Sequence, residues 1–351
     1  MTRFRIATWN LESFARPDPE RGWGPRTPEE YEAKREVLAE TLFRLNPDVV
    51  ALQELGGGED EALEDLRQAG NRRFGRNELD HRALAPADAR GIAVGFLSKR
   101  YLRAVRVVDE LPDPPFDRIG TLDPQASFDR FPRPGLEIRV RAPQPSRLDD
   151  VTLINVHLKS KLLTFPPGFR GGSPFVPRDE ETRARAGALA ILRRSTEALA
   201  VRQRATRFLG GREGRALVVL GDLNDLPTAH TSLLLLGPPG SQPGPIETSR
   251  DGGRAFQTPD RGDLQRLFQL GLRIPEDRRF SRIHEGVPEL VDQILVSEAL
   301  VPRGGDGRRV LPLVDSLVGY HGRLPSLGHD PRVRRGEEGS DHAPVIATFD
   351  L

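Results

Sequence analysis

Residues 216–224 have the sequence ALVVLGDLN, in which five apolar residues run directly into Gly-Asp-Leu-Asn. A continuously apolar run of this length indicates a strand buried on both faces, as in the middle of an α/β sheet. Alternation along the strand directs Asp222 and Asn224 to the same side. Carboxylates and carboxamides are costly to bury unless they meet a metal, a ligand or one another. This strand end therefore indicates a functional site.

Five further polar signatures lie at strand ends or strand starts between residues 8 and 342. They are Thr8-Trp9-Asn10, Gln53-Glu54, Asn155-Val156-His157, Val291-Asp292 and Ser340-Asp341-His342. Each is a weak signal alone, because such residues are often turn residues or satisfied core groups. Their repetition predicts that all six meet at one crevice. Because this crevice draws on both ends of the chain, we expect a single domain over residues 1–351.

The composition excludes several classes of protein. The absence of Cys removes disulfides, thiolate zinc sites and cysteine nucleophiles. Lys and Arg number 52 against 51 Asp and Glu, so no global positive field indicates a nucleic-acid partner. No apolar run approaches membrane-span length, and a strand pattern begins at Met1 without a signal-peptide pattern. We therefore expect a cytoplasmic protein, secreted only if the start is truncated.

Strand and helix patterns alternate along the chain. Thr27-Pro28-Glu29-Glu30 is typical of a capping box, and Asn46-Pro47 ends the helix that it opens. A short helix is predicted to end at Gly70, and one or two helices extend from about 179 to 208, with Leu192 on their apolar stripe. Strands are predicted over 4–10, 48–54, 91–97, 151–158, 216–220, 290–296 and 344–349. This order predicts an α/β fold with mixed sheets.

Several stretches have the composition of surface loops. Residues 110–146 and 163–178 are crowded with Pro, Phe and Arg, which disfavours central strands, and 237–262 is rich in Gly and Pro. We expect loop insertions near 110–146, 163–178, 237–262 and 315–339. The first two are candidates for substrate contacts.

The first two signatures supply oxygen ligands. Asn10 ends a strand face that begins with Phe4 and Ile6, and Glu54 ends the next strand. An amide oxygen beside a hard carboxylate suits Mg²⁺ better than zinc. The strand end at 222–224 supplies groups for water: Asp222 is suited to orient or deprotonate it, and Asn224 to hold it or a phosphate oxygen.

Asp292 shares a strand face with apolar residues, so its charge needs a strong partner, and His342 is the candidate. A carboxylate on one imidazole nitrogen favours the protonated ring, as a general acid/base or a cationic clamp on a phosphoryl oxygen. A structural Asp–His hydrogen bond in the core is the alternative. Asp341 is suited to ligate metal directly or through water.

The signature at 155–157 extends into a basic segment. His157 ends a strand row that contains Asn155, and we expect the imidazole to face a phosphate with Asn155 as its neighbour. A core histidine is the alternative. Lys159 follows on the same side if the extended geometry persists, where it either contacts substrate or is solvated.

The six signatures, in order, resemble the motifs of the endonuclease/exonuclease/phosphatase superfamily, whose members share the deoxyribonuclease I-like fold. The matching segments are Ala7–Asn10, Pro47–Glu54, Asn155–Lys161, Gly221–Asn224, Leu290–Ser297 and Gly339–Pro344. His-Leu-Lys-Ser-Lys at 157–161 and Arg90-Gly91-Ile92 are most similar to bacterial nuclease-type members, often described as extracellular. The resemblance implies a four-layer α/β sandwich in which two mixed β-sheets pack face to face and are flanked by helices.

The resemblance also implies a metal-dependent phosphoester hydrolase and a role for each site residue. Mg²⁺ is the implied cofactor, with Mn²⁺ able to substitute. The implied sets are metal ligands Asn10, Glu54 and Asp341; catalytic residues His157, Asp222, Asn224, Asp292 and His342; and substrate-binding residues Asn155 and Lys159. Asp222 and Asn224 would set the water, Asp292 would orient His342, and His157 would contact the scissile phosphate. Water would attack in line on phosphorus.

Three features depart from the nuclease-type pattern. Gln293 follows the strand aspartate where such relatives often carry His, so a substrate contact there is in doubt. The carboxylate that partners the equivalent of His157 in some relatives has no assignable position. The absence of a leader conflicts with the extracellular subgroup.

Two enzymatic functions and one non-catalytic function follow. The leading hypothesis is a monomeric Mg²⁺-dependent nuclease that hydrolyses DNA, because the loop before Asp341 is rich in cations that could line a phosphate backbone. These are Arg323, Arg332, Arg334 and Arg335 with His321 and His329. The alternative is a phosphatase or phosphodiesterase acting on an inositol phosphate or sphingomyelin, for which Phe165, Phe169 and Phe175 could form a lipid-facing hairpin. A non-catalytic binding module is the third hypothesis, opposed by the intact polar set.

Overall fold

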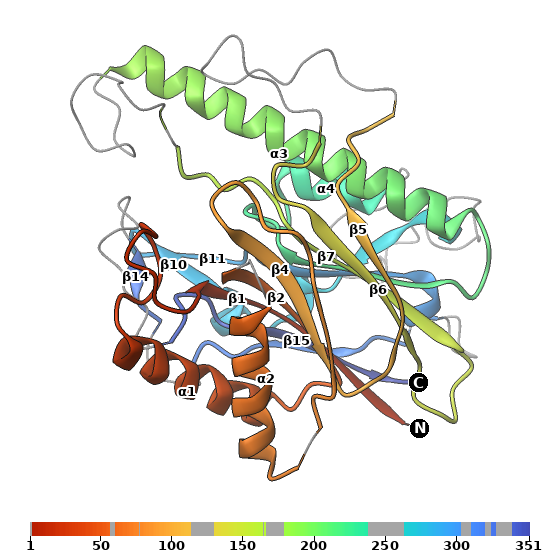
Figure 1. Cartoon of the computed structure of the whole chain (residues 1–351). Coiled ribbons are helices and arrows are strands. Elements are labelled where there is room, and N and C mark those ends of the chain that lie inside the picture. Colours follow the sequence, from red (N-terminus) through yellow and green to blue (C-terminus); the bar gives the residue numbers. More distant parts are fainter. Residues whose placement is uncertain are drawn as a thin grey trace.

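Two mixed β-sheets lie face to face at the centre of the molecule (Figure 1). The computed structural model describes residues 2–56, 60–76, 78–113, 130–163, 165, 179–237, 263–302, 310–319, 324–327 and 339–351. In the first sheet the six strands are β13 (Leu313–Ser316), β15 (Val345–Asp350), β1 (Arg3–Phe14), β2 (Val49–Gly56), β4 (Ile92–Ser98) and β3 (His81–Leu84), in that order.

The second sheet also has six strands, and a small third sheet lies beside the pair. The second contains β5 (Leu102–Val108), β6 (Gly135–Arg141), β7 (Asp150–His157), β8 (Ala216–Asp222), β12 (Asp292–Ser297) and β9 (Leu267–Gln269), in that order. The third contains β11 (Val287–Glu289), β10 (Arg282–His284) and β14 (Ser326–Leu327).

Within the described ranges, four α-helices cover the outer faces of the two large sheets. Helices α1 (Pro28–Leu45) and α2 (Glu61–Phe74) pack on the first sheet, and α3 (Glu180–Leu209) and α4 (His230–Leu236) pack on the second (Figure 1). Short 3-10 turns span Asp263–Gln265, Gly271–Arg273, Glu276–Arg278 and Glu298–Leu300. This arrangement is the four-layer α/β sandwich that the resemblance implied.

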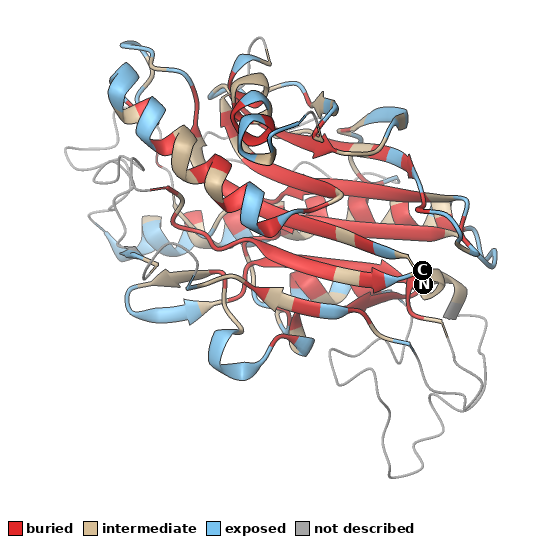
Figure 2. Cartoon of the chain, turned by 90° about the horizontal axis from the view of Figure 1, so that it is seen from below, coloured by how far each residue is buried: buried red, intermediate tan, exposed pale blue. Residues whose placement is uncertain are grey.

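Three hydrophobic cores separate the four layers, and Figure 2 shows the strands as the most continuously buried elements. Alternation along β1 sends Phe4 and Ile6 into the core between the sheets, whereas Ala7, Trp9 and Leu11 pack under the helices. Asn10 therefore points toward the second sheet at the end of a core-directed row, as the period-two pattern predicts.

Helix α1 begins and ends at the residues that the sequence indicates. The side chain of Thr27 accepts a hydrogen bond from the Glu30 amide at 3.2 Å, and Asn46 closes the helix in the left-handed conformation. Helix α2 differs from expectation because it passes through Gly70 and ends before Gly75. A Cβ at residue 70 would lie 3.1 Å from the Leu79 side chain, so close packing explains this glycine.

Two sequence predictions about the second sheet were wrong. Strand β6 lies inside the expected 110–146 insertion and pairs with both β5 and β7, because the Pro residues of this stretch stand before and after the strand and none lies within it. Helix α3 buries only part of the predicted stripe of Leu189, Leu192, Thr196 and Leu199, since Thr196 is buried but Leu192 is 44% exposed. The face that it buries is rich in alanine and includes Ala190, Ala198 and Ala205, which allow close approach to the sheet.

The expected insertions at 163–178, 237–262 and 315–339 lie largely outside the described residues, as do Phe169, Phe175 and the predicted cation-rich set in the 315–339 loop. Among the helices that are described, none is both long and apolar enough to cross a membrane.

Candidate active site

Strand register brings polar residues from three neighbouring strands of the second sheet side by side. In the parallel pair β7–β8, His157 lies opposite Asp222, and in the antiparallel pair β8–β12, Asp292 lies opposite the same Asp222. In the first sheet, β1 and β2 run parallel with Asn10 opposite Gln53, so Glu54 lies one residue further along. The carboxyl ends of β1, β2, β7 and β8 thus share one edge of the sandwich.

The backbone at this edge adopts left-handed conformations that residues other than glycine rarely take. Glu54 and Asn224 have positive φ angles of 59° and 52°, and Gly221 has a φ of 140°. A Cβ at residue 221 would lie 1.9 Å from the carbonyl oxygen of Val156, so only glycine fits between β7 and β8. Strained non-glycine residues gather at functional sites, because the surrounding contacts hold them in a fixed geometry.

Asp222 lies at the centre of the group. Its carboxylate accepts hydrogen bonds from the Asn10 side-chain amide at 3.0 Å and from the Asn224 backbone amide at 2.9 Å. His157 Nε2 lies 3.4 Å from the same carboxylate. Burial, together with the nearby charge of Asp292, raises the pKa of Asp222 to about 6. The pKa of this carboxylate therefore lies closer to neutral pH than that of an ordinary aspartate.

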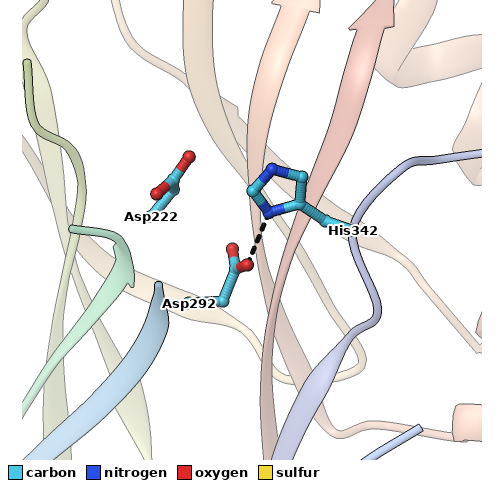
Figure 3. A group of neighbouring side chains, drawn as sticks. All are labelled: Asp222, Asp292 and His342. Atoms are coloured by element: carbon cyan, nitrogen blue, oxygen red, sulfur yellow. Dashed lines mark hydrogen bonds and ion pairs between the residues drawn. The ribbon is translucent and has the colours of Figure 1, made fainter. Parts of the chain in front are cut away.

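Asp292 and His342 form a buried carboxylate–imidazole pair (Figure 3). His342 Nδ1 lies 2.6 Å from Asp292 Oδ2, and the side chains of His342 and Asp292 are 5% and 0% exposed. Burial alone would lower the pKa of His342, but the charge and hydrogen bond of Asp292 outweigh it and raise the pKa above 6.5. The predicted pair is thus present, and it favours the protonated ring.

The pKa of His157 is shifted in the opposite direction to that of His342, which favours the neutral ring. Burial is the largest cause that lowers its pKa well below 6.5, and the charges of Arg133 and Arg90 add to the effect. Its Nδ1 is buried and has no hydrogen-bond partner among the described residues. The sequence assigned no carboxylate to this nitrogen, and the described part of the chain supplies none. His157 is therefore a neutral imidazole beside Asp222.

Glu54 lies on the first-sheet side of the group and is its most accessible member, with a side chain 25% exposed. It accepts hydrogen bonds from the Asn10 side chain at 3.2 Å and from the Ser13 amide and hydroxyl at 3.0 and 3.2 Å. Burial opposes its charge, but Arg133, followed by His342, lowers its pKa below 4.5. Glu54 is an ionised carboxylate at the mouth of the site.

The segment before β15 is tied to β1 by hydrogen bonds. Ser340 Oγ donates to the Asn10 carbonyl at 2.6 Å and accepts from the His342 amide at 3.0 Å. The Trp9 indole donates to the His342 carbonyl at 2.8 Å. The Asp341 amide donates to Glu12 at 3.1 Å. These bonds fix His342 and Asp341 relative to Asn10, although more than 300 residues separate them in sequence.

Asn224 and Asp341 complete the part of the predicted set that meets at this edge. The Asn224 side-chain amide donates to the Leu158 carbonyl at 3.1 Å and so links the ends of β7 and β8. An Asp341 carboxylate oxygen lies 3.8 Å from His342 Nε2, on the side of the ring away from Asp292. Both side chains are buried.

Two predicted substrate-binding residues point elsewhere. Asn155 is 0% exposed; it donates to the carbonyls of Leu52 and Gly95 at 3.0 and 2.8 Å and accepts from Gln53 at 2.7 Å. These bonds between the two sheets account for its burial without a substrate.

Lys159 Nζ donates to the carbonyls of Ser160 and Leu162 at 3.0 and 2.8 Å. Its own segment therefore holds its ammonium group. Burial, aided by the charge of Arg193, lowers the pKa of Lys159 to about 7.

The donor set fits a hard cation. Asp222, Asp292 and His342 offer ligand atoms within 4.8 Å of one another, and Glu54 lies across Asn10 from Asp222. Asp292 Oδ1 is buried without a hydrogen-bond partner in the described part of the chain. Burial, and after it the charge of Asp292, raises the pKa of Asp222, and a divalent cation would favour the ionised carboxylate. Because Asp292 already bonds His342 Nδ1, the carboxylate oxygens of Glu54, Asp222 and Asp341 are candidate ligands. Asn10 Oδ1 accepts a hydrogen bond from the Glu12 amide at 2.9 Å and would have to share or exchange that bond to join them.

Several residues near the site were missed by sequence reasoning. Ser13 and Glu12 follow the first motif directly and hold Glu54 and Asp341, and their positive φ angles of 58° and 51° gave no sequence signal. Arg133 stands in a stretch that was assigned to an insertion. Gln293, where a substrate contact was in doubt, is fully buried and donates to the Asp225 carbonyl at 2.6 Å.

Comparison with known proteins agrees with this geometry. The profile of the Endonuclease/Exonuclease/phosphatase family matches residues 7–342. No curated protein sequence matches the chain. Among solved structures, truncated Caenorhabditis elegans TDP2 superposes with a TM-score of 0.52 at 13% identity, covering 99% of this chain and 98% of that one.

Two further structures are similar in the same way. The human Nocturnin catalytic domain with bound sulfate anion gives a TM-score of 0.51 at 14% identity over 99% of this chain and 94% of its own. An endonuclease/exonuclease/phosphatase family protein from Leptotrichia buccalis gives 0.52 at 10% identity over 99% and 100%. At these identities the structures show a shared fold, and the family match extends over nearly the whole chain. The chain therefore belongs to the endonuclease/exonuclease/phosphatase family and is a phosphoric ester hydrolase.

Proposed function

We propose that this protein is a Mg²⁺-dependent phosphodiesterase that hydrolyses DNA by in-line attack of an activated water. The observation that carries the proposal is the placement of Asp222 between His157 and Asp292 in adjacent strands, with His342 and Glu54 facing the same group. Phosphoester hydrolysis needs a base for water and fixed positive charge for the phosphoryl oxygens. This group offers both within one buried cluster.

Asp222 is the proposed base. With a pKa raised to about 6, its carboxylate is ionised at neutral pH yet basic enough to take a proton from water as the new bond to phosphorus forms. Asn224, whose backbone amide donates to Asp222 Oδ1, is proposed to hold that water. Asn10 donates to the other carboxylate oxygen and so fixes the direction of the base.

The two histidines are proposed to have different roles toward the phosphate. His342, kept protonated by Asp292, places a cationic N–H near the phosphoryl oxygens, where negative charge accumulates during attack. His157 is neutral and is proposed to contact the scissile phosphate as a hydrogen-bonding group without adding charge. Because the two rings differ in protonation, they are not interchangeable.

A metal ion completes the proposal. Asn10, Glu54 and Asp341 are the proposed ligands of Mg²⁺, with Asp222 adjacent, and Mn²⁺ is expected to substitute. The bound cation would supply Lewis-acid charge to the phosphoryl oxygens. Ser13 and Ser340 hold Glu54 and the Asn10 backbone in place, so the ligand oxygens have fixed directions whether or not substrate is present.

DNA is the proposed substrate because the motifs at 157–161 and 90–92 are most similar to nuclease-type members, and because Arg90 and Arg133 place positive charge beside Glu54 and His157. Phosphate-rich polymers are drawn to such charge.

A substrate panel tests the proposal. Plasmid DNA, single strands, abasic-site duplex, RNA, inositol phosphates and sphingomyelin are each incubated at fixed Mg²⁺, with and without EDTA. Asp222→Asn protein, purified in parallel, controls for contaminating nucleases. We expect the wild type to cleave a DNA substrate fastest and EDTA to abolish cleavage. Faster turnover of an inositol phosphate or sphingomyelin, or DNA cleavage that persists in EDTA, contradicts the proposal.

A further inference from the structure

Two arginines, one from each large sheet, meet beside the site. Arg90 stands two residues before β4 and Arg133 two residues before β6. Because β4 runs antiparallel to β2, its start lies where β2 ends, near Glu54. Because β6 runs antiparallel to β7, its start lies where β7 ends, near His157. Topology therefore brings both arginines to the edge that carries the catalytic group.

Asp88 holds the two guanidinium groups together. Its Oδ2 lies 3.1 Å from Arg133 Nε and 3.4 Å from a terminal nitrogen of Arg90. Its Oδ1 accepts hydrogen bonds from the backbone amides of Arg90 and Ile92 at 2.9 and 3.0 Å, which fixes the carboxylate. The side chains of Asp88 and Arg133 are only 8% and 11% exposed, so this is a built cluster and not a mobile surface pair.

The two guanidinium groups use few of their donors on the carboxylate that they share. Within the described ranges, Asp88 is the carboxylate within 4.0 Å of either arginine, and it contacts one nitrogen of each, while Glu54 lies near enough for the charge of Arg133 to lower its pKa. Arg282 differs in its geometry, since two of its nitrogens bond one oxygen of Glu289 at 2.9 and 2.7 Å, while Lys161 bonds the other oxygen at 3.1 Å. A pair of guanidinium groups with unused donors is an anion-binding arrangement, because each presents planar N–H donors suited to phosphate oxygens.

Trp23 lies against the same cluster. Its indole nitrogen donates to the Arg90 carbonyl at 3.0 Å, and the Arg21 guanidinium stacks 4.8 Å from the ring centroid. The next residue, Gly24, packs so closely on the Ser13 carbonyl that an added Cβ would lie 2.9 Å from it, and Ser13 holds Glu54. A half-buried aromatic ring is thus held against the backbone of Arg90, with the Arg21 guanidinium over the ring.

We propose that Trp23, Arg90 and Arg133 form a subsite for one nucleotide unit next to the scissile phosphate, in which the arginine pair binds its phosphate and the indole ring stacks on its base. This inference rests on the proposed function and specifies it. Bases stack on aromatic rings and guanidinium planes whatever their sequence, so the subsite selects a nucleotide polymer and not a particular base. A phosphodiester with neither a second phosphate nor a base would not use it.

Steady-state kinetics on three substrates test the subsite. Bis(p-nitrophenyl) phosphate offers a single phosphodiester, a single-stranded oligonucleotide offers flanking phosphates and bases, and an abasic oligonucleotide offers flanking phosphates alone. The variants are Arg90→Gln, Arg133→Gln and Trp23→Leu. Arg139→Gln is the matched control, because Arg139 pairs with Asp150 on the part of β6 that runs away from the site. Arg90 is 56% exposed, so its substitution keeps the test sound if Arg133→Gln does not fold.

We expect Arg90→Gln and Arg133→Gln to lower kcat/KM on both oligonucleotides by about 10- to 100-fold, mainly through KM, and to lower kcat/KM on bis(p-nitrophenyl) phosphate by a factor at least about tenfold smaller, through the weaker positive charge beside Glu54 and His157. Trp23→Leu is expected to lower kcat/KM about 5- to 10-fold on the oligonucleotide with bases and not on the abasic one. Equal losses on all three substrates, or no loss on any, overturn the subsite while leaving the proposed function in place. A wild-type protein that cleaves none of the three overturns both.

Discussion

The two sides of the site differ in how their charged groups are paired and exposed. On the carboxylate side, Asp292 faces His342 at 2.6 Å and Asp222 accepts two hydrogen bonds, with side chains no more than 5% exposed. On the arginine side, Arg90 and Arg133 share Asp88, and Arg90 is 56% exposed. The first side is a closed set of acids and bases. The second is a pair of guanidinium groups that share one carboxylate, with one of the two largely exposed.

This difference suits the carboxylate side to the chemical step and the arginine side to substrate binding. Buried groups that bond one another have fixed directions and shifted proton affinities, which proton transfer requires. Guanidinium groups with unused donors attract and hold an anion but do not change its bonds. Substitutions on the carboxylate side should therefore act on kcat, and substitutions on the arginine side on KM. Four changes test or sharpen this contrast.

The largest effect is expected from His342→Ala and Asp222→Asn. Each removes a group that acts in the transition state, so kcat should fall by roughly 10³- to 10⁵-fold with little change in KM. Single-turnover hydrolysis of a labelled oligonucleotide measures the loss, and circular dichroism with thermal melting checks that each variant folds. Turnover within tenfold of wild type in both would end the assignment of this side to chemistry.

Asp292→Asn should have the next largest effect, about 10²- to 10⁴-fold on kcat, because the amide cannot stabilise the imidazolium. Asp292 raises the pKa of His342 above 6.5, so the protonated ring persists to higher pH in the wild type than in the variant. The alkaline limb of the kcat/KM profile should therefore move to lower pH in Asp292→Asn. A variant whose profile keeps its shape would show that His342 does not act as a cation.

Ser340→Ala tests whether positioning alone matters on the carboxylate side. Ser340 touches neither reacting group directly but bonds the Asn10 carbonyl and the His342 amide. We expect a loss of about 5- to 30-fold in kcat and of about 1–2 kcal/mol in the free energy of unfolding. Ser340→Thr, which keeps the hydroxyl, is the control and should recover most of the activity. Equal losses in both variants would assign the effect to packing.

The sequence predicted the carboxylate side well. Asp222, Asp292 and His342 each end or precede an apolar strand, where burial demands a partner, and strand alternation gives the face on which each lies. Helix α1 was predicted for the same reason, since its capping residues act on their own backbone. Signals that are local, or that a buried charge enforces, can be recovered from one sequence.

The pairing on the arginine side was not predicted, because the Arg90-Gly91-Ile92 motif marks only one of the two arginines. Arg90 and Arg133 are 43 residues apart, and only the antiparallel pairing of β4 and β6 with their neighbours brings them to one carboxylate. Asn155 shows the converse limit. Alternation gave its face correctly, but that face meets the other sheet before it reaches the site, so its partners are Gln53 and two backbone carbonyls. The alternation along a strand predicts the face on which a side chain lies, whereas the packing of the two sheets decides which groups it bonds.

The smallest effect concerns stability and should appear on the carboxylate side. The folded protein raises the pKa of Asp222 to about 6 from 3.8, so it binds this proton more tightly than the unfolded chain does. The stability that this group contributes is therefore fully present below about pH 4 and is lost as the pH rises through about 6. A carboxamide at this position does not titrate, so the variant Asp222→Asn should not show this loss.

The free energy of unfolding of Asp222→Asn, relative to wild type, should therefore rise by roughly 1–3 kcal/mol between pH 4 and pH 7. Urea denaturation in EDTA measures it, because a bound cation would favour the ionised carboxylate. Arg139→Gln, whose substituted group does not titrate in this window, should show a constant difference. If the relative stability of Asp222→Asn stays constant or falls over this range, ionisation of Asp222 does not destabilise the folded protein. The two sides of the site would then not differ in the way proposed.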